Sequence, residues 1–281
     1  MASEWMCKGR VLSLERPLVM AILNATPDSF SDGGSYSSPE VAADAALRMI
    51  DDGADIIDIG GESSRPGSAY VSADEEMARV LPVVKAIRKR SNVPLSIDTR
   101  KADVARASLA EGADIINDIS AFRDDPGMVS VARTTGAGVV LMHMRGVPST
   151  MQSKTTYGDV VADVAGWLKE RVDAVVAEGV DRKTIAIDPG IGFAKTTEQN
   201  IALLSRMREL AELDAPLLIG LSRKRFIGEI TKVDVPRDRL SGSLTGMLWS
   251  IWHGANILRV HDVKESRQAV DLAFAIASSS H

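Results

Sequence analysis

Polar side chains that can bind or react recur directly after short apolar segments along this chain. Taken singly, each has an ordinary explanation, because Asx residues cap helices and Arg or Lys side chains often lie in solvent. Their recurrence at the end of segment after segment indicates instead that these ends meet around one pocket. The residues are Asn24, Glu62, Ser63, Ser64, Arg65, Asp98, Asn117, Asp118, His143, Asp188, Ser222, Arg223, Lys224, Arg259 and His261.

One part of this set suits a flat heterocycle. Asp98, Asn117 and Asp188 lie at or just inside the ends of apolar segments, so we expect them to be buried and to need hydrogen-bonding partners. An ionised carboxylate only accepts hydrogen bonds, whereas an amide accepts and donates. Together with Lys224, these groups match a ring with N–H donors and ring nitrogens. The alternative is a structural polar network inside the fold.

A second part suits an anion. Arg65, Arg259 and His261 are the candidates, because the guanidinium fork matches phosphate oxygens. Asn24, Asp28 and Asp32 supply the oxygen ligands that Mg²⁺ prefers when it also shares phosphate oxygens. The sequence contains neither an HExxH nor a CxxC motif, which argues against zinc. We therefore expect a heterocycle site beside a phosphate site.

The apolar segments have the length and β-branched content of buried parallel strands. Between most of them lies a stretch of helical period, such as 38–53 or 72–90. Gly-Ala pairs at 53–54, 112–113 and 254–255 mark repeated points where a helix ends and a strand begins, since glycine tolerates a left-handed helix C-terminus. This repeat predicts an α/β protein, a (β/α)8 TIM barrel, with an open doubly wound sheet as the alternative. The predicted strands span 17–23, 55–60, 94–99, 114–119, 138–143, 184–188, 216–221 and 256–261.

We expect a single domain over residues 1–281, because a barrel of roughly 250 residues is of ordinary size. Segment 7–17 predicts a short N-terminal β-hairpin that closes the bottom of the barrel, and 262–279 predicts a final helix. The long loops 24–38 and 144–158 follow strand ends, where barrel enzymes carry lids and binding loops.

Composition narrows the class of protein. The net charge of −5, from 33 basic and 38 acidic residues, argues against a nucleic-acid or membrane-surface partner. The single cysteine, Cys7, excludes an internal disulfide and favours a reducing compartment. We find no signal-peptide core and no apolar run approaching the roughly 20 residues of a membrane span. We therefore expect a cytoplasmic enzyme that acts on small molecules.

Two long segments resemble the dihydropteroate synthase family: MAILNATPDSFSDGG at 20–34 and GADIIDIGGESSRPGS at 53–68. SIDT (96–99), IND (116–118), LMHM (141–144), DPGIGFAKT (188–196), LSRKRFIG (221–228) and RVHDV (259–263) extend the similarity in order, from about residue 8 to about residue 275. The resemblance implies a pterin-binding barrel that condenses 6-hydroxymethyl-7,8-dihydropterin pyrophosphate with p-aminobenzoate, releasing pyrophosphate. It also implies a homodimer and a target of sulfonamides, which mimic p-aminobenzoate.

The resemblance further implies roles for individual residues. The pterin ring would be bound by Asp98, Asn117, Met142, Asp188 and Lys224. The pyrophosphate would be bound by Asn24, Arg65, Arg259 and His261, with Mg²⁺ held by Asn24 and Asp32. The p-aminobenzoate pocket would be formed by Phe30, Ser63, Ser64, Pro66, Phe193 and Arg225. Asp98, Lys224, Asp32 and Arg65 would take part in catalysis.

Three positions depart from the family pattern: Ser64 stands where threonine is common, Ala194 where glycine is frequent, and Arg225 where some members carry serine. Two other functions stay open at this point. A methyltetrahydrofolate-dependent methyltransferase uses a similar barrel but would not need Arg65 or the Arg259–His261 pair. A catalytically silent pterin-binding homologue would be expected to have lost some of these loop residues. A sugar-phosphate isomerase or aldolase fits less well, because it would require a Schiff-base lysine or a glutamate base.

Overall fold

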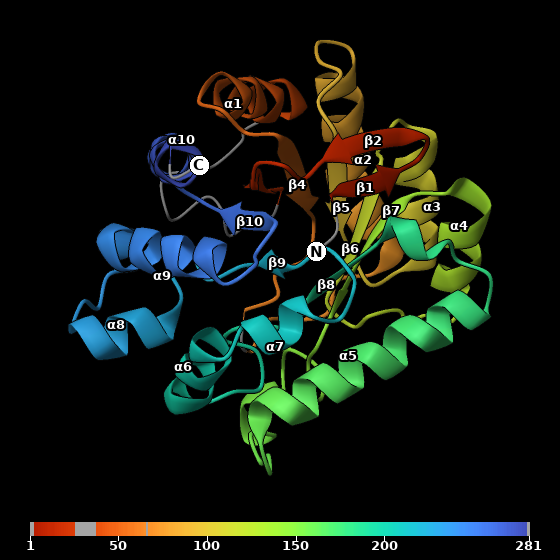
Figure 1. The fold of residues 1–281 in the computed structure, drawn as a ribbon. Helices are drawn as coiled ribbons and strands as arrows, with labels where there is room; N and C mark the ends of the chain where they lie inside the picture. The colour runs from red at the N-terminus through yellow and green to blue at the C-terminus, as the bar shows by residue number, and fades with distance from the viewer. Residues whose placement is uncertain (1–2, 26–37, 66, 280–281) are drawn as a thin grey trace.

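The structure is a computed structural model that describes residues 3–25, 38–65 and 67–279 (Figure 1). Within these residues, eight parallel strands form the wall of a barrel in the order β8-β7-β6-β5-β4-β3-β10-β9. Contact between the outermost strands β8 and β9 closes the wall through a bridge between Ile187 and Leu217. The predicted (β/α)8 barrel is confirmed, and the open sheet is excluded. The strands are β3 (Leu18–Asn24), β4 (Ile56–Gly60), β5 (Leu95–Asp98), β6 (Ile115–Asp118), β7 (Gly138–Met142), β8 (Ile185–Asp188), β9 (Leu218–Ile219) and β10 (Ile257–Val260).

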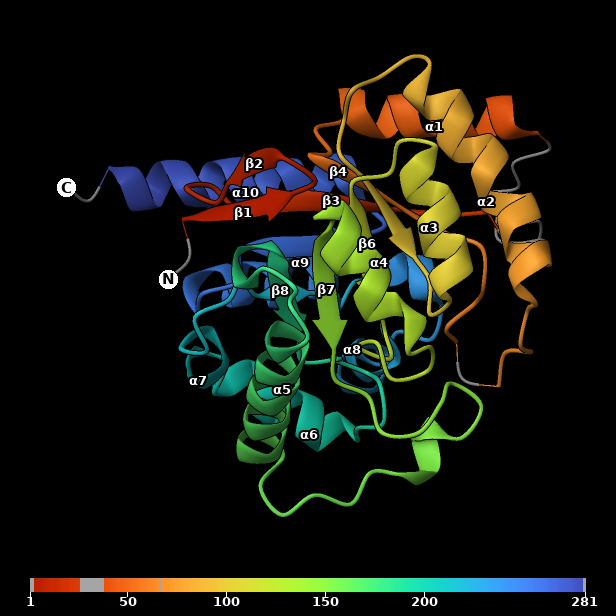
Figure 2. The ribbon, with the colours of Figure 1, turned by 90° about the vertical axis from the view of Figure 1, so that its right-hand side faces the viewer.

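Helices surround the barrel wall (Figure 2). The Ser38 and Ser72 hydroxyls accept hydrogen bonds from backbone N–H groups at the starts of α1 and α2, as helix-capping residues do. Gly53, Gly112 and Gly254 have φ of 102°, 110° and 103°, so the predicted glycine helix ends are confirmed. No helix in the described ranges is long and apolar enough to cross a membrane. The helices are α1 (Pro39–Asp51), α2 (Ala73–Arg88), α3 (Ala102–Ala110), α4 (Gly127–Thr135), α5 (Val160–Ala177), α6 (Thr197–Ser205), α7 (Arg208–Ala211), α8 (Arg225–Thr231), α9 (Leu240–Trp252) and α10 (Val263–Ser278), with 3₁₀ turns η2 (Met151–Ser153), η3 (Arg182–Thr184) and η4 (Pro236–Arg239).

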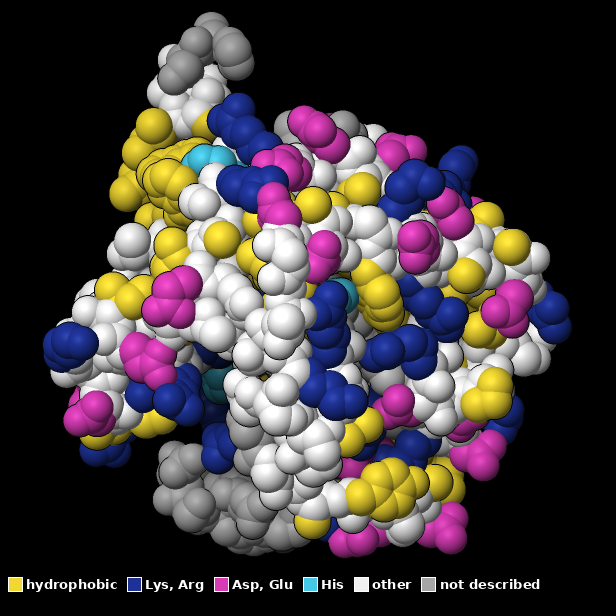
Figure 3. All heavy atoms as spheres, turned by 90° about the horizontal axis from the view of Figure 1, so that it is seen from below, with side chains coloured by type: hydrophobic (Ala, Val, Ile, Leu, Met, Phe, Trp, Pro, Cys, Tyr) yellow, Lys and Arg dark blue, Asp and Glu magenta, His cyan; other side chains and the backbone are white. Residues whose placement is uncertain are grey.

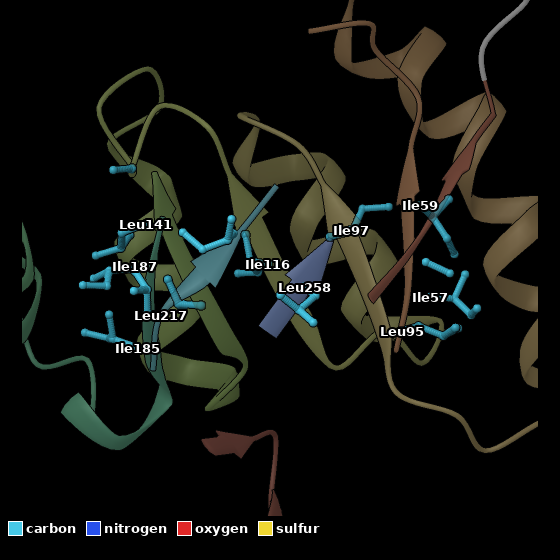
Figure 4. Packing of buried hydrophobic residues seen from close by; sticks show 14 of the residues in the cluster. Ile57, Ile59, Leu95, Ile97, Ile116, Leu141, Ile185, Ile187, Leu217 and Leu258 are labelled. Atoms are coloured by element: carbon cyan, nitrogen blue, oxygen red, sulfur yellow. The ribbon is translucent and has the colours of Figure 1, made fainter. Parts of the chain in front are cut away.

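Successive residues of each strand face opposite sides of the wall. The outward side chains, among them Ile57, Ile97 and Leu258, pack in the core between wall and helices (Figure 4). The inward side chains near the strand N-termini are apolar and form a separate cluster inside the barrel. That cluster comprises Leu18, Met20, Ile56, Ile115, Val140, Ala186, Leu218 and Ile257, together with Trp5, Cys7 and Leu14. The lower half of the barrel is therefore a filled core, as in other barrels of this type.

The N-terminal hairpin closes the bottom of this core, as predicted. Its strands β1 (Glu4–Cys7) and β2 (Arg10–Ser13) pair antiparallel, so the hairpin begins three residues earlier than the predicted segment. Trp5 and Cys7 are fully buried, and the Trp5 indole N–H donates to the Thr184 carbonyl at 2.7 Å. A Cβ at Gly138 would lie 2.5 Å from the Cys7 sulfur, so glycine is needed where the hairpin meets β7.

We expect the Trp5→Phe variant to lose about 2 kcal/mol of unfolding free energy. The change leaves the buried Thr184 carbonyl without its indole donor and removes packing volume under the barrel. Urea denaturation monitored by circular dichroism measures the loss. Val11→Ala is the control, because Val11 lies on the same hairpin and is 52% exposed. A loss as large in the control would show that the hairpin as a whole, not the Trp5 contact, carries the stability.

Candidate active site

Near the C-terminal ends of the strands the inward positions become polar. In the register of the wall, Asp98 on β5 lies between Gly60 on β4 and Asn117 on β6. On the other side of the barrel, Asp188 on β8 lies beside Met142 on β7. Strand alternation thus directs these side chains into one mouth of the barrel, where barrel enzymes bind their substrates.

Arg259 on β10 is the centre of an ionic cluster in this mouth. Its Nε donates to Asp58 Oδ2 at 2.6 Å, and its Nη2 donates to Asp98 Oδ2 at 2.8 Å. Asn117 Nδ2 donates to the same Asp58 oxygen at 3.1 Å. Asp58 is fully buried, and its Oδ1 has no partner within the described part of the chain. One guanidinium therefore serves two carboxylates, the buried Asp58 and the largely buried Asp98, which leaves an excess of hydrogen-bond acceptors.

The pKa of Asp98 is raised in this cluster. Burial raises the pKa to about 7 against the opposing charge of Arg259, and the neighbouring charge of Asp58 adds to the rise. The pKa of Arg259 is itself raised, because the charges of Asp58 and Asp98 outweigh the effect of burial. A ligand that brings N–H donors to Asp98 would relieve the electrostatic cost of this cluster.

Asp188 and Lys224 form the opposite wall of the mouth. Asp188 is buried and accepts a hydrogen bond from the Gly190 N–H at 2.7 Å. Burial lowers the pKa of Lys224 to about 8, although the charge of Asp188 opposes the shift. Lys224 Nζ donates to the Ile191 carbonyl and lies 4.5 Å from the centre of the Phe193 ring.

Met142 and Phe193 belong to an apolar cluster beside these charged groups, together with Ile119, Met144, Met151 and Ala194. Ala194 has φ of 52°, a left-handed conformation in which glycine has no steric cost. This is the physical reason that glycine suits the position. The cluster offers an apolar surface against which a flat ring can pack.

The candidate anion ligands surround the rim. His261 Nδ1 lies 3.1 Å from the Ser222 hydroxyl, and burial lowers the pKa of His261 to about 3, with Arg223, Arg259 and Arg65 adding to the shift. His261 is therefore neutral, and Arg65 is close enough to act on it electrostatically. Asn24 ends β3 at the same rim: its Oδ1 and Asp98 Oδ2 lie 3.9 and 3.8 Å from where a Cβ at Gly60 would stand.

Several predicted site residues do not join this cluster or cannot be placed. Asp28, Phe30, Asp32 and Pro66 lie outside the described residues. Ser63 and Ser64 are partly buried in the loop after β4. Arg225 is exposed at the start of α8, where its Nε pairs with Glu229 at 2.6 Å. Their roles stay predictions. The magnesium site also stays a prediction, because Asp32 lies outside the described residues.

Asp58 and Lys195 are buried charged residues of this site that the pattern of polar strand ends does not predict. Asp58 lies in the middle of the predicted strand 55–60 rather than at its end. Its signal was a single charged residue in the apolar run IIDIG, two positions before the inward-facing Gly60. Lys195 is 4% exposed, and its Nζ donates to the carbonyls of Gly190 and Phe193, each at 3.0 Å. Lys195 thus holds the loop that carries Phe193 and follows Asp188.

Comparisons with known proteins agree with this geometry. The family described as "Pterin binding enzyme" matches residues 20–261. The dihydropteroate synthase of Synechocystis sp. is 47% identical over 262 residues, which cover 93% of this chain and 91% of that protein. The structure of Xanthomonas albilineans dihydropteroate synthase with 4-aminobenzoic acid has a TM-score of 0.92 and 44% identity, and covers 99% of both chains.

A second structure of the Xanthomonas albilineans enzyme, in complex with 7,8-dihydropteroate, has a TM-score of 0.88 and 42% identity, over 98% of this chain and 99% of that one. The sequence similarity spans nearly the whole chain, and the fold and the order of the strand-end residues agree with it. The chain belongs to the dihydropteroate synthases of the pterin-binding enzyme family.

Proposed function

We propose that this protein condenses 6-hydroxymethyl-7,8-dihydropterin pyrophosphate with p-aminobenzoate to give 7,8-dihydropteroate and pyrophosphate. The observation that carries the proposal is the excess of buried acceptors at the barrel mouth, where Asp58 and Asp98 share the Arg259 guanidinium. A pterin ring offers the N–H donors that such a site lacks. The product and the arylamine bound by the Xanthomonas albilineans enzyme are the molecules that this reaction makes and consumes.

The reaction needs no protein nucleophile. The bond between the pterin methylene carbon and the pyrophosphate oxygen breaks, and its electron pair leaves with pyrophosphate. The arylamine nitrogen then forms the new C–N bond and loses a proton to solvent. The protein would align the two substrates, exclude water and stabilise charge. Asp98 and Asp188 would accept hydrogen bonds from the pterin and favour the positive charge that develops on it.

The rim residues would stabilise the departing anion. Arg65 and Arg259 would offer guanidinium groups to the pyrophosphate oxygens, and the neutral His261 would offer a ring N–H donor beside them. Asn24 presents a carboxamide oxygen at the same rim, which fits a ligand of Mg²⁺. A bound Mg²⁺ would neutralise charge on the pyrophosphate.

The proposal is tested by measuring pyrophosphate release from the pterin substrate with and without p-aminobenzoate, in Mg²⁺ and in EDTA. We expect release that depends on both p-aminobenzoate and Mg²⁺, with dihydropteroate identified by mass spectrometry. Binding of the pterin in calorimetry without release of pyrophosphate would contradict the proposal and point to a silent homologue. Binding of methyltetrahydrofolate in its place would point to a methyltransferase.

We also propose that the protein is a homodimer. Trp249, Trp252, Leu272 and Phe274 of helices α9 and α10 are large apolar residues with 43%, 56%, 64% and 40% exposure. Hydrophobic side chains gather on one edge of the face seen in Figure 3. An apolar patch of this kind is typical of a protein interface.

Sedimentation equilibrium should give about twice the chain mass of 30.1 kDa for the wild-type protein. We expect Trp252→Ser to shift the protein to the monomer mass, because it removes the large exposed ring from this patch. Ile230→Ser, on α8, is the control, since Ile230 is 51% exposed outside the patch. A monomeric wild type would refute the dimer.

A further inference from the structure

The loop between β4 and α2, residues 61–72, is anchored at its base through Glu62. Glu62 Oε1 accepts a hydrogen bond from the Val71 N–H at 3.1 Å, so one side chain joins the beginning of the loop to its end. Gly61 packs so closely on α2 that a Cβ there would lie 2.7 Å from the Val80 side chain. Arg79 Nη1 also donates to the Gly61 carbonyl at 2.8 Å.

The other oxygen of Glu62 belongs to an ionic network between β5 and α3. Glu62 Oε2 accepts from Arg100 Nη2 at 3.0 Å and from Lys101 Nζ at 2.9 Å. Lys101 Nζ also donates to the fully buried Glu76 at 2.5 Å, and Arg100 Nη1 donates to Asp124 at 2.6 Å. Arg100 and Lys101 follow Asp98 by two and three residues, so this network links the loop base to the strand that carries Asp98.

The network keeps Glu62 ionised. Burial alone would raise the pKa of Glu62, but hydrogen bonds from Lys101 and Val71 and the charge of Arg100 hold it below its ordinary value. Arg100 and Lys101 each have a second carboxylate partner. Loss of the Glu62 charge therefore leaves neither cation without an ion pair.

The rest of the loop folds on itself above this base. The Ser68 hydroxyl donates to the Ser63 carbonyl at 2.5 Å, and the Ser68 N–H donates to the Arg65 carbonyl at 3.1 Å. The Gly67 N–H reaches the Pro148 carbonyl at 3.4 Å, in the loop that follows β7. The turn is thus ordered by its own backbone, and the rest of the protein holds it at its Glu62 base and at Pro148.

We propose that Glu62 is a positioning residue that sets Ser63, Ser64 and Arg65 over the p-aminobenzoate side of the pocket. The inference rests on the proposed function, because it names the second substrate of that reaction. Because Arg100 keeps Asp124 and Lys101 keeps Glu76 when the Glu62 charge is lost, we expect the effect in the geometry of the loop rather than in the free energy of unfolding. A fixed loop binds its ligand without the entropy cost of ordering the loop at each turnover.

The test is steady-state kinetics of Glu62→Gln, combined with amide hydrogen exchange of segment 62–71. Glutamine keeps an acceptor for the Val71 N–H, but its amide cannot satisfy both cations. We expect KM for p-aminobenzoate to rise about tenfold, and KM for the pterin pyrophosphate to change less than about twofold. Exchange at 62–71 should accelerate while the melting temperature stays near that of the wild type.

Glu111→Gln is the matched control, because Glu111 pairs with Lys85 at 3.0 Å on the exposed surface and lies outside the loop. Arg100→Gln should raise KM for p-aminobenzoate in the same direction, since it removes one of the two cations that hold Glu62. An unchanged KM for p-aminobenzoate in Glu62→Gln, or an equal rise of both KM values, would overturn the proposal. A wild-type protein without turnover would instead refute the proposed function, and the exchange data would still report whether Glu62 anchors the loop.

Discussion

Replacing Asp98 by asparagine is expected to lower kcat/KM for the pterin pyrophosphate by about 10²- to 10³-fold. The variant keeps the shape of the side chain but replaces a carboxylate oxygen by an N–H donor. That donor faces the guanidinium of Arg259 and the N–H groups that a pterin would present. Pyrophosphate release measures the effect, and calorimetry separates weaker pterin binding from slower chemistry.

The pH profile gives an independent check on the same residue. The pKa of Asp98 is about 7 in the ligand-free protein, so the carboxylate is ionised above this pH and protonated below it. Protonation removes an acceptor, and kcat/KM should therefore fall as the pH drops below about 7. Asp103→Asn is the control, since Asp103 pairs with Arg106 on the surface of α3. An acidic limb near pH 4 would contradict the raised pKa.

Replacing Asp58 by asparagine is expected to lower both the stability and the activity of the protein. Asp58→Asn removes the buried charge that pairs with Arg259 and accepts from Asn117. Breaking a buried ion pair on one side should cost about 3 kcal/mol of unfolding free energy. Arg259 and Asn117 would also lose their fixed positions, which should lower kcat/KM by about 10²-fold.

Ser96→Ala is the matched control for Asp58→Asn. Ser96 is the register partner of Asp58 on β5, is fully buried, and has a hydroxyl without a partner among the described residues. Its removal should change the unfolding free energy by less than about 0.5 kcal/mol. Denaturant titration of both variants distinguishes loss of the ion pair from a general sensitivity of this layer of the barrel. Equal stability of wild type and Asp58→Asn would show that Asp98 alone satisfies Arg259.

The barrel could be predicted from the sequence because its strands are short apolar runs that end in glycine or polar residues. Each predicted strand overlaps a strand of the structure, and seven of the eight contain theirs whole, whereas β3 extends one residue beyond the prediction, to Asn24. The residues at which a strand begins and ends depend on tertiary contacts. The predicted strand 216–221, for example, contains the two-residue strand β9. The start of the hairpin was placed too late, because Trp5 is buried only through contact with the strand N-termini.

The site could be predicted in part, since strand alternation carries Asp98, Asn117 and Asp188 into one mouth. Asp58 lies in the middle of β4, so the pattern of polar residues at strand ends does not include it. The pairing of Arg259 with two carboxylates joins residues more than 160 positions apart in sequence, and no local pattern records it. Arg225 follows Lys224 directly, so no local pattern shows which of the two faces the pocket. In the structure Lys224 donates to the Ile191 carbonyl, whereas Arg225 pairs with Glu229 on the surface.

The barrel wall is expected to open locally first at the seam where β8 meets β9. Within the described residues, this seam is joined by the Ile187–Leu217 bridge and a 2.9 Å bond from the Ile187 N–H to the Pro216 carbonyl. The amide groups here should be the least protected of the wall, since local opening begins where the fewest bonds must break. A pterin held by both Asp188 and Lys224 would span this seam. Substrate binding would then stabilise the seam between β8 and β9 against local opening, and the gain in unfolding free energy would grow with ligand concentration.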